Sequence, residues 1–147
     1  CPGHTKGHIA YHIPSEYSVF AGDTLFSLGC GRVVEGTMEE MFNSVSQFKE
    51  MSPATYLYCG HEYTLSNARF ALSVEPMNRM LQQRAAVVST LREEGKMTCP
   101  STIGEELKAN PFLRTNSPEI RRNLGMASAS DAEVFAELRR RKDGFKA

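Results

Sequence analysis

The hydrophobic pattern of the first part of the chain predicts short strands. Residues 7–13 ("GHIAYHI") and 18–22 ("SVFAG") are rich in aromatic and β-branched residues, and the "PSE" between them is typical of a turn. Residues 24–28 ("TLFSL") form another apolar run, which leads into a glycine-rich "GCG" segment. Residues 54–60 ("ATYLYCG") again have the pattern of a strand. This part of the chain is therefore expected to form a small sheet.

A helical pattern interrupts these strands in the segment "GTMEEMFNSVSQFKEM". Thr37 and Glu40 have the spacing of a capping box, which predicts the helix start. Five apolar residues then fall on one helical face: Met38, Met41, Phe42, Val45 and Phe48. Strand, helix and strand in this order indicate an α/β layer over residues 1–64.

The second part of the chain, residues 65–147, has helical patterns and no predicted strand. One helix is expected to end near Gly95, another to start at Ser101 or Thr102 and to end before Pro111. The last helix, in "DAEVFAELRRRKDGF", is expected to have Asp131 as its cap. The sequence thus predicts an α/β part followed by an all-helical part.

Composition narrows the classes of partner. Lys plus Arg and Asp plus Glu both number 17, so the net charge is 0, which argues against a nucleic-acid or anionic membrane surface. No apolar run approaches the roughly 20 residues that span a bilayer. The four cysteines form no CxxC pair, which disfavours a zinc ribbon. They are expected to be reduced thiols of an intracellular protein, although their even number leaves a disulfide open.

Three polar residues each follow a glycine beside a predicted strand. They are His4 in "PGHT", Asp23 in "AGDT" and His61 in "CGHE". Small neighbours allow close approach of a ligand, and imidazole with carboxylate is the usual ligand set for zinc, iron or manganese. The alternative is that each histidine is a hydrogen-bonded loop residue.

Two further histidines follow His4 at intervals of four, His8 and His12. Gly7 and the segment "IAYHI" favour a strand over a helix here. We therefore expect no shared helical face and no ligand role for His8 and His12.

The chain closely resembles glyoxalase II, a family of hydroxyacylglutathione hydrolases, over nearly its whole length. The motifs that carry the resemblance are "PGHTKGHIAYHIP", "FAGDTLFSLGCGR", "YCGHEYT", "NARFALSVEP", "PSTIGEEL", "NPFLR" and "FAELRRRKD". The resemblance implies the C-terminal half of a metallo-β-lactamase αββα sandwich over residues 1–64. It also implies a helical glutathione-binding domain over residues 65–147.

The resemblance implies two divalent metals, with zinc expected first and iron or manganese as alternatives. His4 would bind the first metal, His61 the second, and Asp23 would bridge the two. In this family a hydroxide held between the metals attacks the thioester carbonyl of S-D-lactoylglutathione, which yields D-lactate and glutathione.

The resemblance also implies a glutathione site. Arg32, Tyr63, Arg139 and Lys142 match residues that contact the ligand, and the spacing of Arg139 and Lys142 puts both on one helix face. Without the resemblance, "RRRK" would be a solvated basic face. Val34 stands where some relatives have a tyrosine, which puts one ligand contact in doubt.

The chain departs from the family in one respect: the "HxHxDH" motif that supplies the other metal ligands is absent. The metal site cannot be completed from this chain, and an apolar sheet face would be left open. The chain is then a C-terminal part of the enzyme, a half-protein completed by a partner chain that covers the sheet, or an inactive structural subunit.

Two alternative activities remain open: hydrolysis of another thioester, and a single-iron persulfide dioxygenase of the same superfamily. The long helical end favours glyoxalase II. The resemblance leaves a cytosolic and a mitochondrial location open.

Overall fold

Four strands form a mixed sheet in the computed structural model, which describes residues 1–146. In spatial order they are β1 (Tyr11–Ile13), β2 (Ser18–Gly22), β5 (Tyr56–Cys59) and β6 (Ser101–Thr102). β2 runs parallel to β5, and the outer pairs are antiparallel. β3 (Leu25–Phe26) and β4 (Gly29–Cys30) form a separate antiparallel hairpin.

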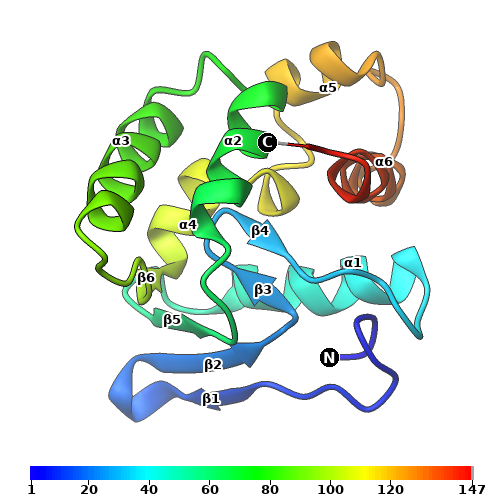
Figure 1. The fold of residues 1–147 in the computed structure, drawn as a ribbon. Coiled ribbons are helices and arrows are strands. Elements are labelled where there is room, and N and C mark those ends of the chain that lie inside the picture. The colour runs from blue at the N-terminus through cyan, green and yellow to red at the C-terminus, as the bar shows by residue number, and fades with distance from the viewer. Residues whose placement is uncertain (147) are drawn as a thin grey trace.

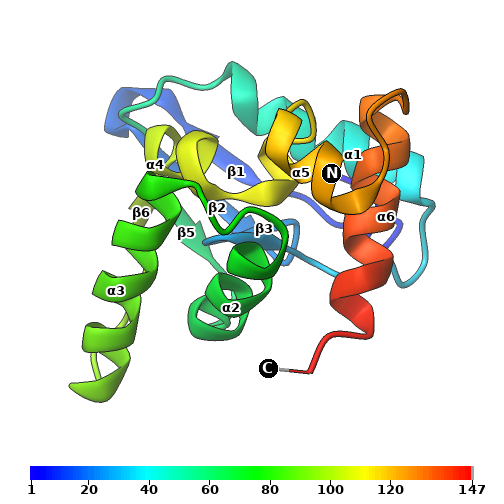
Figure 2. The same cartoon turned by 90° about the horizontal axis from the view of Figure 1, so that it is seen from above.

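The helices pack on one side of this sheet, which is above β1 and β2 in Figure 1. The α-helices are α1 (Met38–Ser46), α2 (Thr64–Val74), α3 (Arg79–Glu93), α4 (Ile103–Ala109), α5 (Pro118–Leu124) and α6 (Asp131–Asp143). Three 3-10 helices lie in the connections: η1 (Pro14–Glu16) between β1 and β2, η2 (Gln47–Glu50) after α1, and η3 (Pro111–Leu113) between α4 and α5. Figure 2 shows α6 beside α1, so the last helix returns to the first part of the chain.

Capping boxes fix the start of two helices. The Glu40 amide donates to Thr37 Oγ1 at 3.1 Å, and the Thr37 amide donates to Glu40 Oε2 at 2.8 Å, as predicted. Thr102 and Glu105 form the same pair of bonds at α4, which confirms Thr102 over Ser101 as its cap.

The cap of the last helix is predicted wrongly. Ser130 Oγ accepts from the Glu133 amide at 3.2 Å, so Ser130 is the cap and Asp131 is the first helical residue. Ser130 and Asp131 are adjacent, and both have side chains that commonly cap helices, so the sequence alone could not decide between them.

Several strand boundaries also differ from the sequence pattern. Within 7–13 only Tyr11–Ile13 pairs as a strand, and in the segment before it the His8 side chain binds Asp23 and Thr24 of the turn after β2. The "PSE" turn is the 3-10 helix η1, and "GCG" contributes the short strand β4. The second part of the chain is not all-helical, since β6 pairs with β5.

One hydrophobic core joins both predicted parts of the chain. Val19 and Leu57 from the sheet are fully buried, and they belong to the same cluster as Met41 of α1 and Phe135 of α6. Burial of apolar area in such a cluster is the main stabilising term. The division of the chain at residue 64 stays a prediction.

The other face of the sheet is exposed and apolar. It carries Tyr11, Ile13, Phe20, Tyr56 and Tyr58, which we call the aromatic face. The rings of Phe20 and Tyr58 stack with centroids 4.9 Å apart. Exposed apolar patches of this kind mark interaction surfaces. Among the helices of residues 1–146, none combines the length and apolar character needed to cross a membrane.

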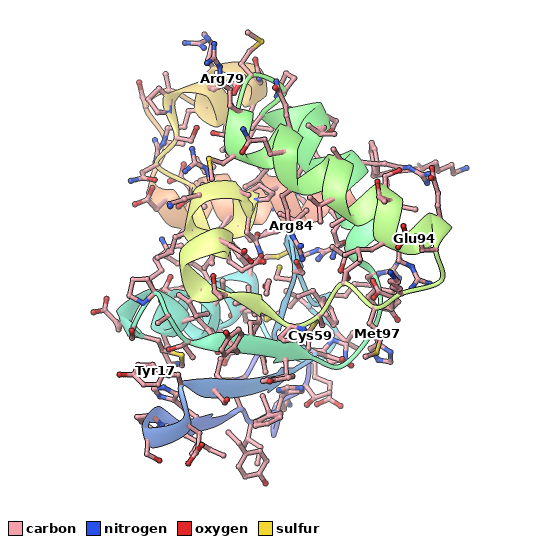
Figure 3. The ribbon with its side chains drawn as sticks, turned by 90° about the vertical axis from the view of Figure 1, so that its left-hand side faces the viewer. Tyr17, Cys59, Arg79, Arg84, Glu94 and Met97 are labelled. Atoms are coloured by element: carbon pink, nitrogen blue, oxygen red, sulfur yellow. A yellow bond between two sulfur atoms is a disulfide. The ribbon has the colours of Figure 1, made fainter. Side chains whose placement is uncertain are left out.

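Two of the four cysteines are bonded to each other. Cys59, at the end of β5, forms a disulfide with Cys99, and Figure 3 shows Cys59 beside the segment that carries Met97. The expectation of reduced thiols is therefore wrong for this pair, and the disulfide left open by the even number is present. Cys1 and Cys30 are free.

Candidate metal and substrate site

The carboxylate of Asp23 lies between two histidine rings. Its Oδ2 is 3.4 Å from His4 Nε2, and its Oδ1 is 3.3 Å from His61 Nε2. Asp23 follows β2 and His61 follows β5, and these strands are parallel neighbours, so their carboxyl ends meet at one edge of the sheet. The N-terminal loop brings His4 to the same place. The three residues predicted as metal ligands are thus together.

Hydrogen bonding fixes the tautomer of a neutral His4. Its Nδ1 lies 2.9 Å from the Arg32 carbonyl oxygen, and because a carbonyl only accepts, Nδ1 carries the proton. Nε2 then presents a lone pair to the Asp23 carboxylate, which is also an acceptor. These two acceptors, 3.4 Å apart, could both bind one cation placed between them.

The distances around Asp23 suit shared metal ligands. Two ligands that are each about 2.1 Å from a tetrahedral metal stand roughly 3.4 Å apart. A metal-binding histidine also typically donates its other ring N–H to a carbonyl, as His4 does to Arg32. Within residues 1–146 no group of three or more His, Cys, Asp or Glu side chains, these three included, is arranged to hold a metal ion by itself. The three side chains therefore fit part of a metal centre.

The absence of a side chain at Gly60 leaves space for the Asp23 carboxylate. A Cβ added at Gly60 would lie 2.6 Å from Asp23 Oδ1, which is closer than a carbon can stand. The glycine before His61 therefore lets the ends of β2 and β5 approach each other. This is the close approach that the "CGH" pattern suggested.

A pocket of about 380 Å³ opens beside Asp23. Its basic wall consists of Arg32, Arg139 and Lys142, from the loop after β4 and from α6. The remaining lining residues are His4, Asp23, Phe26, Cys30, Gly31, His61, Tyr63, Ser66 and Asn67. All seven residues predicted from the sequence as metal or substrate ligands line this one pocket.

Tyr63 stacks on the imidazole of His61. The ring centroids are 5.0 Å apart with an interplanar angle of 17°. The rings of Phe26 and Tyr63 are in a T-shaped arrangement with their centroids 5.2 Å apart. Tyr63 is half exposed, so its ring can both restrict His61 and contact a bound molecule.

The basic residues of the pocket differ in their surroundings. Arg139 is 3% exposed, and its guanidinium donates to the Cys30 oxygen and to Asp143. Lys142 is half-buried, and burial together with the charges of Arg139 and Arg32 lowers its pKa. An anion in the pocket would relieve this crowding of positive charge.

Val34 lies away from the pocket. Its side chain is 66% exposed, and it is absent from the residues that line the pocket. Cys30 lies in the pocket wall, where burial raises the pKa of its thiol to about 11, so the thiol is protonated and unreactive near neutral pH.

Sequence reasoning missed the contribution of His8. Its ring lies against the main chain of Asp23 and the side chain of Thr24, and burial lowers the pKa of His8. The signal was the second Gly-His pair in "GHTKGH". The expectation that His12 has no ligand role stays a prediction, and the structure places His12 exposed on β1.

Two protein families match this chain. Residues 1–61 match the metallo-beta-lactamase superfamily, and residues 62–145 match the hydroxyacylglutathione hydrolase C-terminus. Together the matches cover the residues around Asp23 and those of α6.

Curated relatives give the same result. A hydroxyacylglutathione hydrolase of Mesorhizobium japonicum is 55% identical over 144 residues, which are 98% of this chain and 56% of the relative. One from Bartonella tribocorum is also 55% identical, and one from Methylococcus capsulatus is 50% identical over 145 residues. These cover 98% and 99% of this chain and 57% of each relative. The chain thus spans little more than half the length of the curated relatives it matches.

Proposed function

Because the chain belongs to the hydroxyacylglutathione hydrolase family, we propose that it is part of a thioester hydrolase. The proposed reaction converts S-D-lactoylglutathione and water to D-lactate and glutathione. The observation that carries the proposal is the Asp23 carboxylate between His4 and His61, beside a basic pocket. The family match over residues 62–145 also argues against a persulfide dioxygenase, which is expected to lack this helical end.

His4, Asp23 and His61 would hold divalent metal ions, and we propose zinc, with iron or manganese as alternatives. The metals would lower the pKa of a water molecule and polarise the thioester carbonyl. Asp23 is suited to a bridging role because each of its oxygens faces a different histidine. The Arg32 carbonyl keeps the His4 ring oriented by accepting from Nδ1.

The basic wall would bind the carboxylates of glutathione. Arg32 and Lys142 bring positive charge to the mouth of the pocket, and Arg139 adds to the field from its buried position. Tyr63 offers a ring and a hydroxyl beside His61. Hydrolysis breaks the C–S bond and forms a C–O bond, and the glutathione thiolate leaves without strong acid assistance.

The donor set needs more ligands than this chain provides, so we propose a protein partner for the aromatic face. That partner is the N-terminal half of the enzyme, on the same or on another polypeptide. It would cover Tyr11, Phe20 and Tyr58 and would bring the missing histidines and aspartate to the edge of the sheet.

Metal content and activity of the native protein test this proposal. We expect about two metal ions per site by elemental mass spectrometry and chelator-sensitive hydrolysis of S-D-lactoylglutathione. If the native protein contains no metal and shows no chelator-sensitive hydrolysis, the proposed thioester hydrolase activity is excluded.

The second candidate is a catalytically inactive subunit of a larger assembly. The exposed aromatic face favours it, since that surface needs a partner whether or not a metal is bound. Stable association of the native protein with a partner chain, together with absence of metal, is the result that would distinguish this candidate.

A further inference from the structure

His8 is built into the turn that carries Asp23. The main-chain N–H of Asp23 donates to His8 Nε2 at 3.0 Å. The other ring nitrogen, Nδ1, lies 3.0 Å from the hydroxyl oxygen of Thr24, which is fully buried. A single imidazole therefore binds two consecutive residues of the turn between β2 and β3.

The direction of these hydrogen bonds follows from chemistry. A backbone N–H can only donate, so His8 Nε2 accepts and carries no proton. The proton of the neutral ring is on Nδ1, which donates to Thr24 Oγ1. Only one tautomer of His8 satisfies both contacts.

The backbone of the turn is shaped to receive this ring. Gly22 has φ +54°, and a Cβ there would lie 2.7 Å from His8 Cε1 and 2.8 Å from Nε2. A side chain at Gly22 would thus displace the imidazole. His8 holds the main chain of Asp23 on one side, while Gly60 packs against its carboxylate on the other.

We propose that His8 is the positioning residue that sets Asp23 between His4 and His61. The inference rests on the proposed metal-binding function of Asp23 and adds a residue that does not itself contact the metal. Loss of the acceptor at Nε2 would leave the Asp23 amide without its hydrogen bond. The Asp23 main chain, and with it the position of the carboxylate, would then be less restricted. Partners of this kind change metal affinity by about 10-fold to 100-fold when they are removed.

Nuclear magnetic resonance of the ¹⁵N-labelled 147-residue chain tests the contact without any variant. We expect the Nδ1-protonated tautomer of His8 and a scalar coupling across the hydrogen bond between the Asp23 amide nitrogen and His8 Nε2. The Nε2-protonated tautomer, or the absence of this coupling, would overturn the proposal.

A pair of variants then tests what the contact does. His8→Gln keeps one acceptor and one donor, whereas His8→Leu removes both. We expect His8→Leu to speed exchange of the Asp23 amide proton at least about 10-fold and to weaken Co(II) binding about 10-fold to 100-fold. His8→Gln is expected to restore most of both. The matched control is His12→Leu, at an exposed position on β1, which should change neither.

The outcomes separate this proposal from the proposed function. If His8→Gln is as impaired as His8→Leu, or if His8→Leu leaves both readouts unchanged, the positioning role is wrong. If the unaltered chain binds no Co(II) by itself, as its incomplete donor set allows, exchange of the Asp23 amide alone decides the role of His8, and the metal content of the native protein decides the metal proposal.

Discussion

Arg139 of the last helix donates a hydrogen bond of 2.6 Å to the carbonyl oxygen of Cys30, 109 residues earlier in the chain. The same nitrogen lies 3.3 Å from the Gly31 oxygen, and the guanidinium stands over the Phe112 ring. Arg139 therefore ties α6 to β4. Lys142, one turn further along α6, borders the pocket without this role.

Substitution of Lys142 is predicted to weaken binding of the glutathione thioester. Lys142→Ala removes one charged contact, so the Michaelis constant should rise about 10-fold with an unchanged turnover number. Arg139→Ala with Lys142→Ala is predicted to raise the Michaelis constant further. The measurement is steady-state hydrolysis by the native protein, with Arg141→Ala on the same helix as the control. An unchanged Michaelis constant would rule out the assignment of Lys142.

Substitution of Arg139 alone is predicted to affect stability as well. Arg139→Ala leaves the Cys30 carbonyl without its side-chain donor, at a cost of about 1–3 kcal/mol, and leaves the Gly31 carbonyl with only the weak thiol donor of Cys30. We expect a loss of about 2–4 kcal/mol in the free energy of unfolding, measured with urea. A variant of unchanged stability but raised Michaelis constant would show instead that Arg139 acts only through the ligand.

Local signals made much of the fold predictable. Thr37 with Glu40 marked a helix start because a capping box is a contact between near neighbours in the chain. β6 could not be predicted, because Ser101 and Thr102 form a strand only by pairing with Leu57 and Tyr56. Strands of two residues depend on tertiary contacts, which the local pattern does not contain.

The site shows the same division between local and tertiary information. The Gly-His and Gly-Asp pairs drew attention to His4, Asp23 and His61, and the structure brings these together. The role of His8 in holding Asp23 was missed, because the second Gly-His pair marks the residue and does not reveal a hydrogen-bond partner 15 residues away. The different surroundings of Arg139 and Lys142 were equally hidden, since helical spacing assigns a face and not a depth of burial.

Asp23 is predicted to be indispensable for a two-metal centre. Asp23→Ala removes the carboxylate whose two oxygens face His4 and His61, so a reconstituted site should hold fewer than two metals per chain. Elemental mass spectrometry after dialysis measures the ratio, and Glu16→Ala in the exposed η1 is the control. Two metals retained in Asp23→Ala would disprove the bridging role.

Glu106 of α4 joins the helical part to the loop between β3 and β4. It is 1% exposed, and its Oε1 accepts from the Leu28 amide at 2.7 Å and from Asn110 Nδ2 at 3.0 Å. Its Oε2 faces the hydroxyls of Ser27 and Ser101 at 3.0 and 2.7 Å. Burial raises the pKa of Glu106 above its ordinary value, although these hydrogen bonds lower it.

The raised pKa predicts a specific pH dependence of stability. The folded state holds the Glu106 proton more tightly than the unfolded state, so this contribution is complete below the unfolded pKa of about 4.3. It is lost as pH rises through the folded pKa. Glu106→Gln cannot titrate and can keep all four contacts, because its amide can donate to the serine hydroxyls. Its stability relative to the unaltered chain should therefore improve as pH rises from about 4 through the raised folded pKa of Glu106.

Urea unfolding across this pH range measures the difference between the two free energies of unfolding. Glu106→Ala should be about 3 kcal/mol less stable than Glu106→Gln at every pH, because neither variant titrates at this position and alanine leaves the buried Leu28 amide without its acceptor. Glu133→Gln, an exposed position on α6, controls for the loss of a charge alone. If Glu106→Gln is as unstable as Glu106→Ala, or its difference from the unaltered chain does not change with pH, then the buried carboxyl is ionised and the interpretation of its burial is wrong.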